Sequence, residues 1–315
     1  MFKIGIVGYG NLGSALERTV SEFPDLELTA VFSRRDVADI ENASQNIIPF
    51  SDILDYRGSI DALLLAWGSS GDLCESAKAL AAHFNTVDSF DMHRDIVGHR
   101  ESVGKIAEKS KKLAVVSSGW DPGLMSLARL YFSAFMPGAA VNSFWGEGVS
   151  AGHSEAVRRI GGVRYAVQYT VPNVKAREAA FAGKRLTPTE SHTRVCYVVA
   201  VPGAEQRIER EIREMRGYFA GYDTEVNFIS EAEFFDRHRT LYHRGEVIAS
   251  NNLFGYRQTA ALTLDLGSNP LFTAGAMLAT ARAACRLNSE GVTGALTFFD
   301  IPPKYFLAED PMRLL

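Results

Sequence analysis

The feature that most constrains this fold is a short apolar run at the N-terminus that leads directly into a G-x-G-x-x-G pattern. The run Lys3–Val7 is typical of a strand, and Ser14–Glu22 is compatible with a helix. Gly8 allows a tight turn, Gly10 lets the backbone approach a pyrophosphate, and Gly13 lets the helix pack on the strand. Phosphates then bind free N–H groups at the helix N-terminus.

The pattern alone is a weak signal in a chain with 27 glycines. Its position between a strand and a helix nevertheless favours a dinucleotide site over a glycine-rich turn. The residues expected to line this site are Gly8, Tyr9, Gly10, Asn11, Leu12 and Gly13.

The end of the next predicted strand indicates which dinucleotide binds. The strand Leu26–Phe32 is followed by Ser33, Arg34 and Arg35. Chains that bind NAD usually carry an acidic residue at this place, about 20 residues after the glycines. A hydroxyl and two guanidinium groups suit a 2′-phosphate instead. Asp36 is the one residue that argues for NAD, and we predict NADP.

Composition excludes several classes of function. The chain has 315 residues, which is long enough for two domains. It is 46% hydrophobic and carries a formal charge of −4. Mild acidity without a basic run argues against nucleic acid, and no apolar run approaches the ~20 residues of a membrane span. Three scattered cysteines indicate reduced thiols and a cytoplasmic protein. No metal-ligand spacing and no G-x-S-x-G pattern is present.

The first third of the chain alternates strands and helices. The runs Asp61–Trp67, Thr86–Asp88 and Leu113–Ser117 are strand-like and mostly apolar, which predicts an α/β, Rossmann-type, doubly wound parallel sheet. Ligands bind such sheets at the carboxyl ends of the strands. The residues predicted to face this crevice with the cofactor are Gly68, Ser69, Ser70, Asp88, Ser89, Asp91, Met92 and His93, and Gly119, Trp120 and Asp121 follow the next strand.

The pattern changes after about residue 140. Strands such as Tyr165–Val171 and Arg194–Val201 lack the strand–helix alternation, which predicts an α+β domain with a largely antiparallel or mixed sheet. A long helix, Leu271–Leu287, precedes a strand, Gly294–Asp300. We predict a dinucleotide domain at 1–118, a substrate-binding and dimerisation domain at 119–266, and a segment at 267–315 that returns to the first domain.

Charged residues at the predicted crevice indicate a cationic substrate. Asp88, Asp91 and Asp121 at strand ends near a nicotinamide suit an amine, because they hold an ammonium and accept its proton before hydride leaves the carbon. For Asp121, which precedes Pro122, a helix cap is an equally good interpretation. Arg194 adjoins an apolar strand and needs a carboxylate partner, from the protein or from a substrate.

Several of these motifs together resemble one family. In the same order along the chain, they are similar to those of the meso-diaminopimelate dehydrogenase family. The motifs are Gly8–Gly13, Phe32–Arg35, Val87–Ile96, Ser118–Gly123, Phe144–Gly146, Gly152–Ser154 and Gln168–Thr170 with Pro172. The resemblance implies NADP-dependent oxidative deamination at the D-centre of meso-2,6-diaminopimelate. The products are L-2-amino-6-oxopimelate, ammonia and NADPH, and the reverse direction is a step of lysine biosynthesis. It also implies a homodimer.

The resemblance further implies roles for single residues. Asp91 and Asp121 are the catalytic pair at the D-centre, in a site lined by Trp120, Trp145, Ala151 and Gly152. The residues that hold the distal L-centre are Thr170, Arg194, His243 and Asn269. Ala151 and Glu155 depart from the family pattern, where glutamine and aspartate are common, so that only backbone contacts of this loop carry over.

Two alternatives compete with this interpretation. Oxidoreductases of the glucose–fructose oxidoreductase and dihydrodipicolinate reductase types use a Glu-Lys-Pro or a His-His motif, and this chain has neither. A non-catalytic NADP-binding sensor does not need carboxylates at three strand ends and an arginine in the second domain. Formation of NADPH from NADP and meso-diaminopimelate separates the three.

Overall fold

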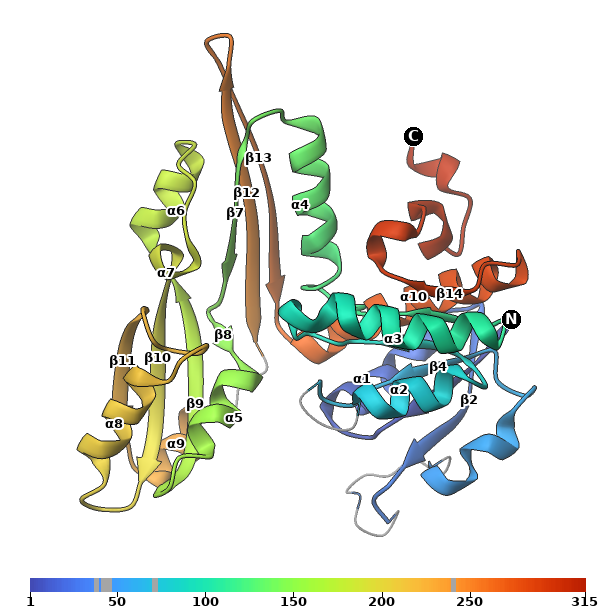
Figure 1. The fold of residues 1–315 in the computed structure, drawn as a ribbon, viewed down its shortest axis with the longest axis horizontal. Helices are drawn as coiled ribbons and strands as arrows, with labels where there is room; N and C mark the ends of the chain where they lie inside the picture. Colours follow the sequence, from blue (N-terminus) through green and yellow to red (C-terminus); the bar gives the residue numbers. More distant parts are fainter. Residues whose placement is uncertain (37–39, 41–46, 70–72, 239–241) are drawn as a thin grey trace. The chain divides into compact units, whose positions relative to one another are not determined.

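The computed structural model describes residues 1–36, 40, 47–69, 73–238 and 242–315. Contacts divide the chain into two compact units, whose elements are labelled in Figure 1. Unit 1 combines Met1–Leu127 with Pro270–Leu315, and unit 2 is Ala128–Asn269. In the described residues, no helix combines the length and apolar character needed to cross a membrane.

Unit 1 is built on a seven-stranded sheet in the order β14-β6-β5-β4-β1-β2-β3. Every pair of neighbouring strands is parallel, as predicted. The strands are β1 (Phe2–Val7), β2 (Leu26–Ser33), β3 (Ile47–Pro49), β4 (Ala62–Leu65), β5 (Asn85–Asp88), β6 (Leu113–Val115) and β14 (Gly294–Leu296). The helices are α1 (Asn11–Thr19), α2 (Leu73–Ala81), α3 (Ile96–Lys109), the start of α4 (Leu124–Phe135) and α10 (Asn269–Ser289).

The strands of unit 1 are mostly apolar because helices cover both faces of the sheet. Ile4 and Ile6 belong to a core cluster with residues of α1 and α10. Val7 and Leu65 belong to a second cluster with residues of α2 and α3. Successive strand residues point to opposite faces, so a strand buried on both faces shows no polar alternation.

The C-terminal segment completes the sheet of unit 1. β14 pairs with β6, with Gly294 opposite Leu113. The buried guanidinium of Arg282, on α10, forms a bidentate ion pair with Asp25 and donates to the carbonyl of Phe306 at 2.7 Å. Our prediction of a strand as far as Asp300 was wrong. Thr297 and the carboxylate of Asp300 form a capping box that starts a 3₁₀ turn immediately after the strand.

Unit 2 is an α+β unit with two sheets, one mixed and one antiparallel, which confirms the predicted class. The first sheet has the order β11-β10-β9-β8 and the second β13-β12-β7. Its strands are β7 (Ala140–Trp145), β8 (Gly148–Val149), β9 (Val163–Pro172), β10 (His192–Ala200), β11 (Asp223–Phe228), β12 (His243–Leu253) and β13 (Tyr256–Leu266). Its helices are α5 (Ala151–Arg158), α6 (Val174–Phe181), α7 (Pro188–Ser191), α8 (Glu205–Glu214), α9 (Glu231–Arg237) and most of α4.

The faces of the four-stranded sheet differ in what covers them. Cys196 and Val198 on β10 pack against residues of α8. Because side chains alternate along a strand, Arg194 lies on this same face. Tyr197 lies on the other face, where its ring stacks on His238 at the end of α9, with 4.1 Å between ring centroids.

Candidate active site

The glycine turn of unit 1 has the geometry of a nucleotide loop. Gly8 has a φ of 96°, which side chains disfavour, and a Cβ there would lie 2.8 Å from the ring of Trp67. A Cβ on Gly13 would lie 2.0 Å from the carbonyl oxygen of Gly8, so only glycine lets α1 start so close to β1. A Cβ on Gly10 would meet nothing within 4 Å. The approach to the unpaired first N–H groups of α1 is therefore open.

Two arginines stand beside this turn at the end of β2. Arg34 is exposed, and its guanidinium carbon lies 4.2 Å from the ring centroid of Trp67 and 5.2 Å from that of Phe50. Arg35 is exposed too and donates to the carbonyl of Tyr9, in the glycine turn. Ser33 is buried, and its hydroxyl accepts the N–H of Arg35 at 3.0 Å. Both guanidinium groups therefore lie beside the glycine turn, whose geometry suits phosphate binding.

The loops after β4, β5 and β6 meet at the carboxyl edge of the sheet. The N–H of Asp91 donates to the hydroxyl of Ser69 at 2.9 Å. Ser118 donates its N–H to the carbonyl of Asp88 at 2.7 Å. The structure therefore gathers the loops that carry the predicted residues Gly68, Ser69, Asp88, Ser89, Asp91, Met92, His93, Trp120 and Asp121. Ser70 lies outside the described residues.

Asp88 differs from the expectation that its carboxylate faces the crevice. Its side chain is buried, and Oδ1 accepts the N–H groups of Phe90 at 3.0 Å and Ser117 at 2.9 Å. Oδ2 lies 2.7 Å from Nε2 of His99, which stacks on Phe90. A carboxylate saturated in this way braces the ends of β5 and β6 from inside the protein.

The other two carboxylates are more accessible. Asp91 is exposed, whereas Asp121 is half-buried and accepts the hydroxyl of Ser126 at 3.4 Å. Trp120, which precedes Asp121 on the same loop, is 8% exposed and forms a bridge with Gly123 across a tight turn. Of the three predicted carboxylates Asp88, Asp91 and Asp121, the last two are therefore the ones that meet solvent.

Unit 2 brings three of the predicted distal residues together. Thr170 on β9 lies directly opposite Arg194 on β10, and Gly148 on β8 lies opposite Thr170 from the other side. The ring of His243, on β12, packs so closely on Gly148 that a Cβ there would lie 2.4 Å from it. Thr170 and Arg194 contact each other, and His243 packs on Gly148, the strand neighbour of Thr170. We call these three buried residues the arginine cluster.

The guanidinium of Arg194 is unusual for a cation in a protein interior. It is 9% exposed, donates to the hydroxyl of Thr170 and lies over the ring of Tyr222, 4.3 Å from its centroid. Its Nε is buried without a hydrogen-bond partner, and no ion pair to Arg194 occurs within the described residues. Burial lowers the pKa of the guanidinium, with Tyr222 opposing this. A buried cation in this state suits a carboxylate from outside the protein.

The remaining predicted residues of unit 2 are placed as follows. Trp145 ends β7 half-buried, and Gly152 is exposed in the first turn of α5. Ala151 begins α5, and its side chain lies outside the described residues. Asn269 is the first residue of α10. Glu155 forms ion pairs with Arg158 and Arg159 on α5, at 2.9 and 3.2 Å.

Sequence reasoning missed residues that support this site. His99 braces Asp88 from a helix and is marked by no local motif. Tyr222 lies under Arg194 from the turn before β11. His192 accepts the N–H of Trp145 and lies two residues before Arg194. Because side chains alternate along a strand, the sequence alone places it on the same face as Arg194. No group of three or more potential metal ligands occurs in the part of the chain that the structure describes.

Comparisons with known proteins agree with both units. Residues 119–268 match the family model described as the diaminopimelic acid dehydrogenase C-terminal domain. The meso-diaminopimelate D-dehydrogenase of Ureibacillus thermosphaericus is 45% identical over 95% of this chain and 94% of its own length. The chain belongs to the meso-diaminopimelate D-dehydrogenase family.

Solved structures of this family have the same fold. The DAP dehydrogenase of C. glutamicum in complex with DAP is 40% identical, with a TM-score of 0.94 over 99% of this chain and 98% of that chain. An engineered D-amino acid dehydrogenase bound to NADP+ is 39% identical, with a TM-score of 0.90 over 99% of this chain and 98% of that chain. Both solved structures share both units with this chain.

Proposed function

We propose that this protein oxidatively deaminates the D-centre of meso-2,6-diaminopimelate with NADP+ and water, so that the uncharged amine gives L-2-amino-6-oxopimelate, ammonia, NADPH and a proton. The observation that carries the proposal is the arginine cluster, in which the buried guanidinium of Arg194 lacks a protein carboxylate among the described residues. Membership of the family supports the same substrate. The substrate has two amino acid groups, and each unit offers groups that complement one of them.

Unit 1 supplies the chemistry of the D-centre. An amine carbon loses hydride readily only when its nitrogen is uncharged, so the ammonium first gives up a proton. Asp91 is exposed at the edge of the sheet and can bind this ammonium and accept the proton. Asp121 stands on the neighbouring loop and is assigned the same task. A bound NADP accepts the hydride.

The cofactor is proposed as NADP because of the end of β2. The exposed Arg34 and Arg35 offer charge-assisted hydrogen bonds to a 2′-phosphate beside the open glycine turn. Cation–π contacts of Arg34 with Trp67 and Phe50, whose rings pack edge to face, hold its guanidinium in place. Asp36 is exposed at the same strand end and is the residue that favours NAD.

The arginine cluster supplies recognition of the L-centre. Arg194 is assigned to the distal carboxylate, with Thr170 and His243 as the hydrogen-bonding neighbours that read its configuration. Burial lowers the pKa of His243, so its ring is neutral at neutral pH. A neutral imidazole leaves the cluster with one positive charge, which matches one carboxylate.

We also propose that the protein is a homodimer and that the domain predicted at 119–266 carries the dimer contact. Phe135, Phe254 and Tyr256 in unit 2 are 77%, 91% and 77% exposed, and a dimer contact would cover large apolar side chains of this kind. The edge strand β13 exposes most of its residues as well. Light scattering gives the mass in solution directly, and a monomer contradicts this part.

The experiment for the activity follows absorbance at the NADPH band with protein, NADP and meso-diaminopimelate. LL-diaminopimelate, which has no D-centre, is the matched control. We expect NADPH with the meso isomer, none with the LL isomer, and much slower reduction of NAD. Equal rates with both isomers, or no reaction with the meso isomer, contradict the proposal.

A further inference from the structure

The outer edge of β7 needs partners from elsewhere in the chain. β7 pairs with β12 on one side only. Near its end, the N–H of Gly146 donates to the carbonyl of Arg244 on β12 at 2.8 Å. Successive N–H groups of a strand point to opposite sides, so the N–H of Trp145 points to the outer edge. A half-buried edge N–H costs free energy unless it finds an acceptor.

His192 supplies this acceptor. The N–H of Trp145 donates to Nε2 of His192 at 2.9 Å. Nδ1 of the same ring donates to the carbonyl of Pro188 at 3.2 Å, which fixes the tautomer. The ring also stacks on that of Trp145, with 5.2 Å between centroids and 28° between planes. Burial, and to a smaller extent the charge of Arg194, lowers the pKa of His192 to about 4, so its ring is a neutral acceptor.

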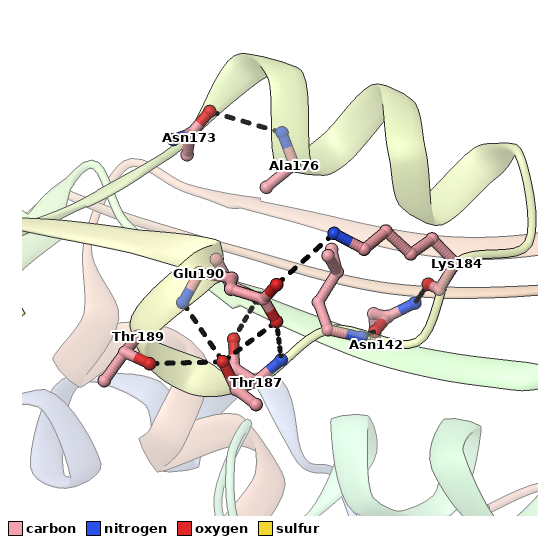
Figure 2. Close-up of polar contacts among 9 residues, drawn as sticks. Asn142, Asn173, Ala176, Lys184, Thr187, Thr189 and Glu190 are labelled. Carbon is pink, nitrogen blue, oxygen red and sulfur yellow. Dashed lines mark hydrogen bonds and ion pairs between the residues drawn. The ribbon is translucent and has the colours of Figure 1, made fainter.

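His192 is held by the segment 184–192, which we call the edge segment. Asn142 of β7 donates to the carbonyl of Lys184 at 3.0 Å and accepts the N–H of Leu186 at 2.9 Å. Thr187 and Glu190 form a capping box that starts α7, and Lys184 pairs with Glu190 at 3.3 Å, as Figure 2 shows. The edge segment is therefore attached to β7 in its middle, through Asn142, and at its end, through Trp145.

This arrangement is part of the surroundings of the arginine cluster. Gly146, which follows Trp145, has a φ of 125°, and a Cβ there would lie 1.9 Å from the carbonyl oxygen of Thr170. On the other side, His192 lies two residues from Arg194 on β10, and both are buried. The backbone at Trp145 is thus fixed between the edge segment and a residue of the cluster.

We propose that His192 is a positioning residue for the substrate: by its hydrogen bond and its stacked ring it sets the backbone and indole of Trp145 beside the arginine cluster. The inference rests on the proposed function, which assigns Trp145 to the wall of the substrate site. His192 itself transfers no proton, because its two ring nitrogens are engaged with Trp145 and Pro188. The edge segment serves as its rigid support.

The test compares two variants of His192 in the full-length protein. His192→Phe keeps a flat ring but can neither accept nor donate a hydrogen bond, whereas His192→Gln keeps a side-chain acceptor. We expect His192→Phe to lower kcat/KM for meso-diaminopimelate roughly 5- to 150-fold, mainly through KM, because a donor is left unsatisfied. KM for NADP stays unchanged, and His192→Gln recovers most of the loss.

A second measurement needs no activity. Labelling with ¹⁵N-tryptophan gives backbone amide signals for only three residues, Trp67, Trp120 and Trp145. We expect the Trp145 amide to exchange with solvent at least about tenfold faster in His192→Phe than in the wild type, with the other two unchanged. His192→Gln restores the protection.

His238→Phe is the matched control, because it removes another histidine of unit 2 that stacks on an aromatic ring, that of Tyr197. It should leave KM for meso-diaminopimelate unchanged.

If His192→Phe fails to fold, Glu190→Gln takes its place. This variant weakens the exposed capping box and should also raise KM for meso-diaminopimelate. The inference is overturned if His192→Phe has the same KM for meso-diaminopimelate and the same amide exchange rate at Trp145 as the wild type. An inactive wild type overturns the proposed function instead, and the exchange measurement then decides on its own whether His192 fixes Trp145.

Discussion

Replacing Arg194 by methionine tests the most specific part of the proposed chemistry. Arg194 is 9% exposed, its guanidinium donates to the hydroxyl of Thr170, and its buried Nε has no hydrogen-bond partner in the described part of the chain. Methionine fills similar space without the charge. Truncating one partner of a buried, hydrogen-bonded charge pair costs roughly 2–5 kcal/mol. At ~1.36 kcal/mol per decade, this corresponds to a fall in kcat/KM for meso-diaminopimelate of about 30- to 5,000-fold.

The assay measures kcat/KM for meso-diaminopimelate and for D-alanine, which has a D-centre but no distal carboxylate. We expect Arg194→Met to harm D-alanine far less than meso-diaminopimelate. Arg213→Met is the control, because Arg213 bonds the carbonyl of Thr224, the residue opposite Arg194 on β11, and its loss perturbs the same sheet. An equal fractional loss on both substrates refutes the assignment of Arg194 and makes its role structural.

Three further predictions concern the cofactor, the base and pH. Arg34→Asp should raise KM for NADP at least about tenfold, since it replaces a charge-assisted contact by repulsion; unchanged KM values for NADP and NAD contradict the cofactor assignment. Asp91→Asn should lower kcat roughly 10²- to 10⁴-fold while NADP affinity, measured by fluorescence titration, is retained; near-normal turnover argues against the base. Burial lowers the pKa of His192 from 6.5 to about 4, so only the unfolded chain takes up this proton as pH falls from about 6.5 to 4. Stability is therefore lost in that window, by about 2 kcal/mol between pH 8 and pH 5 for this group, and urea unfolding of His192→Gln should show a correspondingly smaller loss.

The parts of the fold that the sequence predicted have local causes. The glycine turn was predictable because Gly8 and Gly13 meet steric demands set within a few residues of themselves. The strands of unit 1 were predictable because burial on both faces leaves an uninterrupted apolar run. β13 was not predicted, since residues such as Arg257 and Thr259 on an exposed edge strand show no apolar alternation.

The site was predictable to a smaller extent because its geometry depends on residues far apart in the chain. The carboxylate of Asp88 faces inward because His99, on the next helix, and the N–H of Ser117, just after the next strand, bind it. Trp145 is fixed by a histidine 47 residues further along the chain. Such pairings are set by tertiary contacts, which local propensity does not encode.

The pairing of β14 with β6 has a consequence for how the protein is made. A ribosome delivers Leu113 and all of unit 2 before it delivers Gly294, the partner of Leu113 in the sheet. Before α10 is synthesised, the core cluster that includes Ile4 and Ile6 lacks the buried residues of that helix, such as Met277. We therefore expect nascent chains arrested after Asn269 to resist brief proteolysis in unit 2 but not in unit 1, and equal sensitivity of both units contradicts this. On this expectation, a chain that terminates early does not form the nucleotide site, and only completed molecules bind NADP.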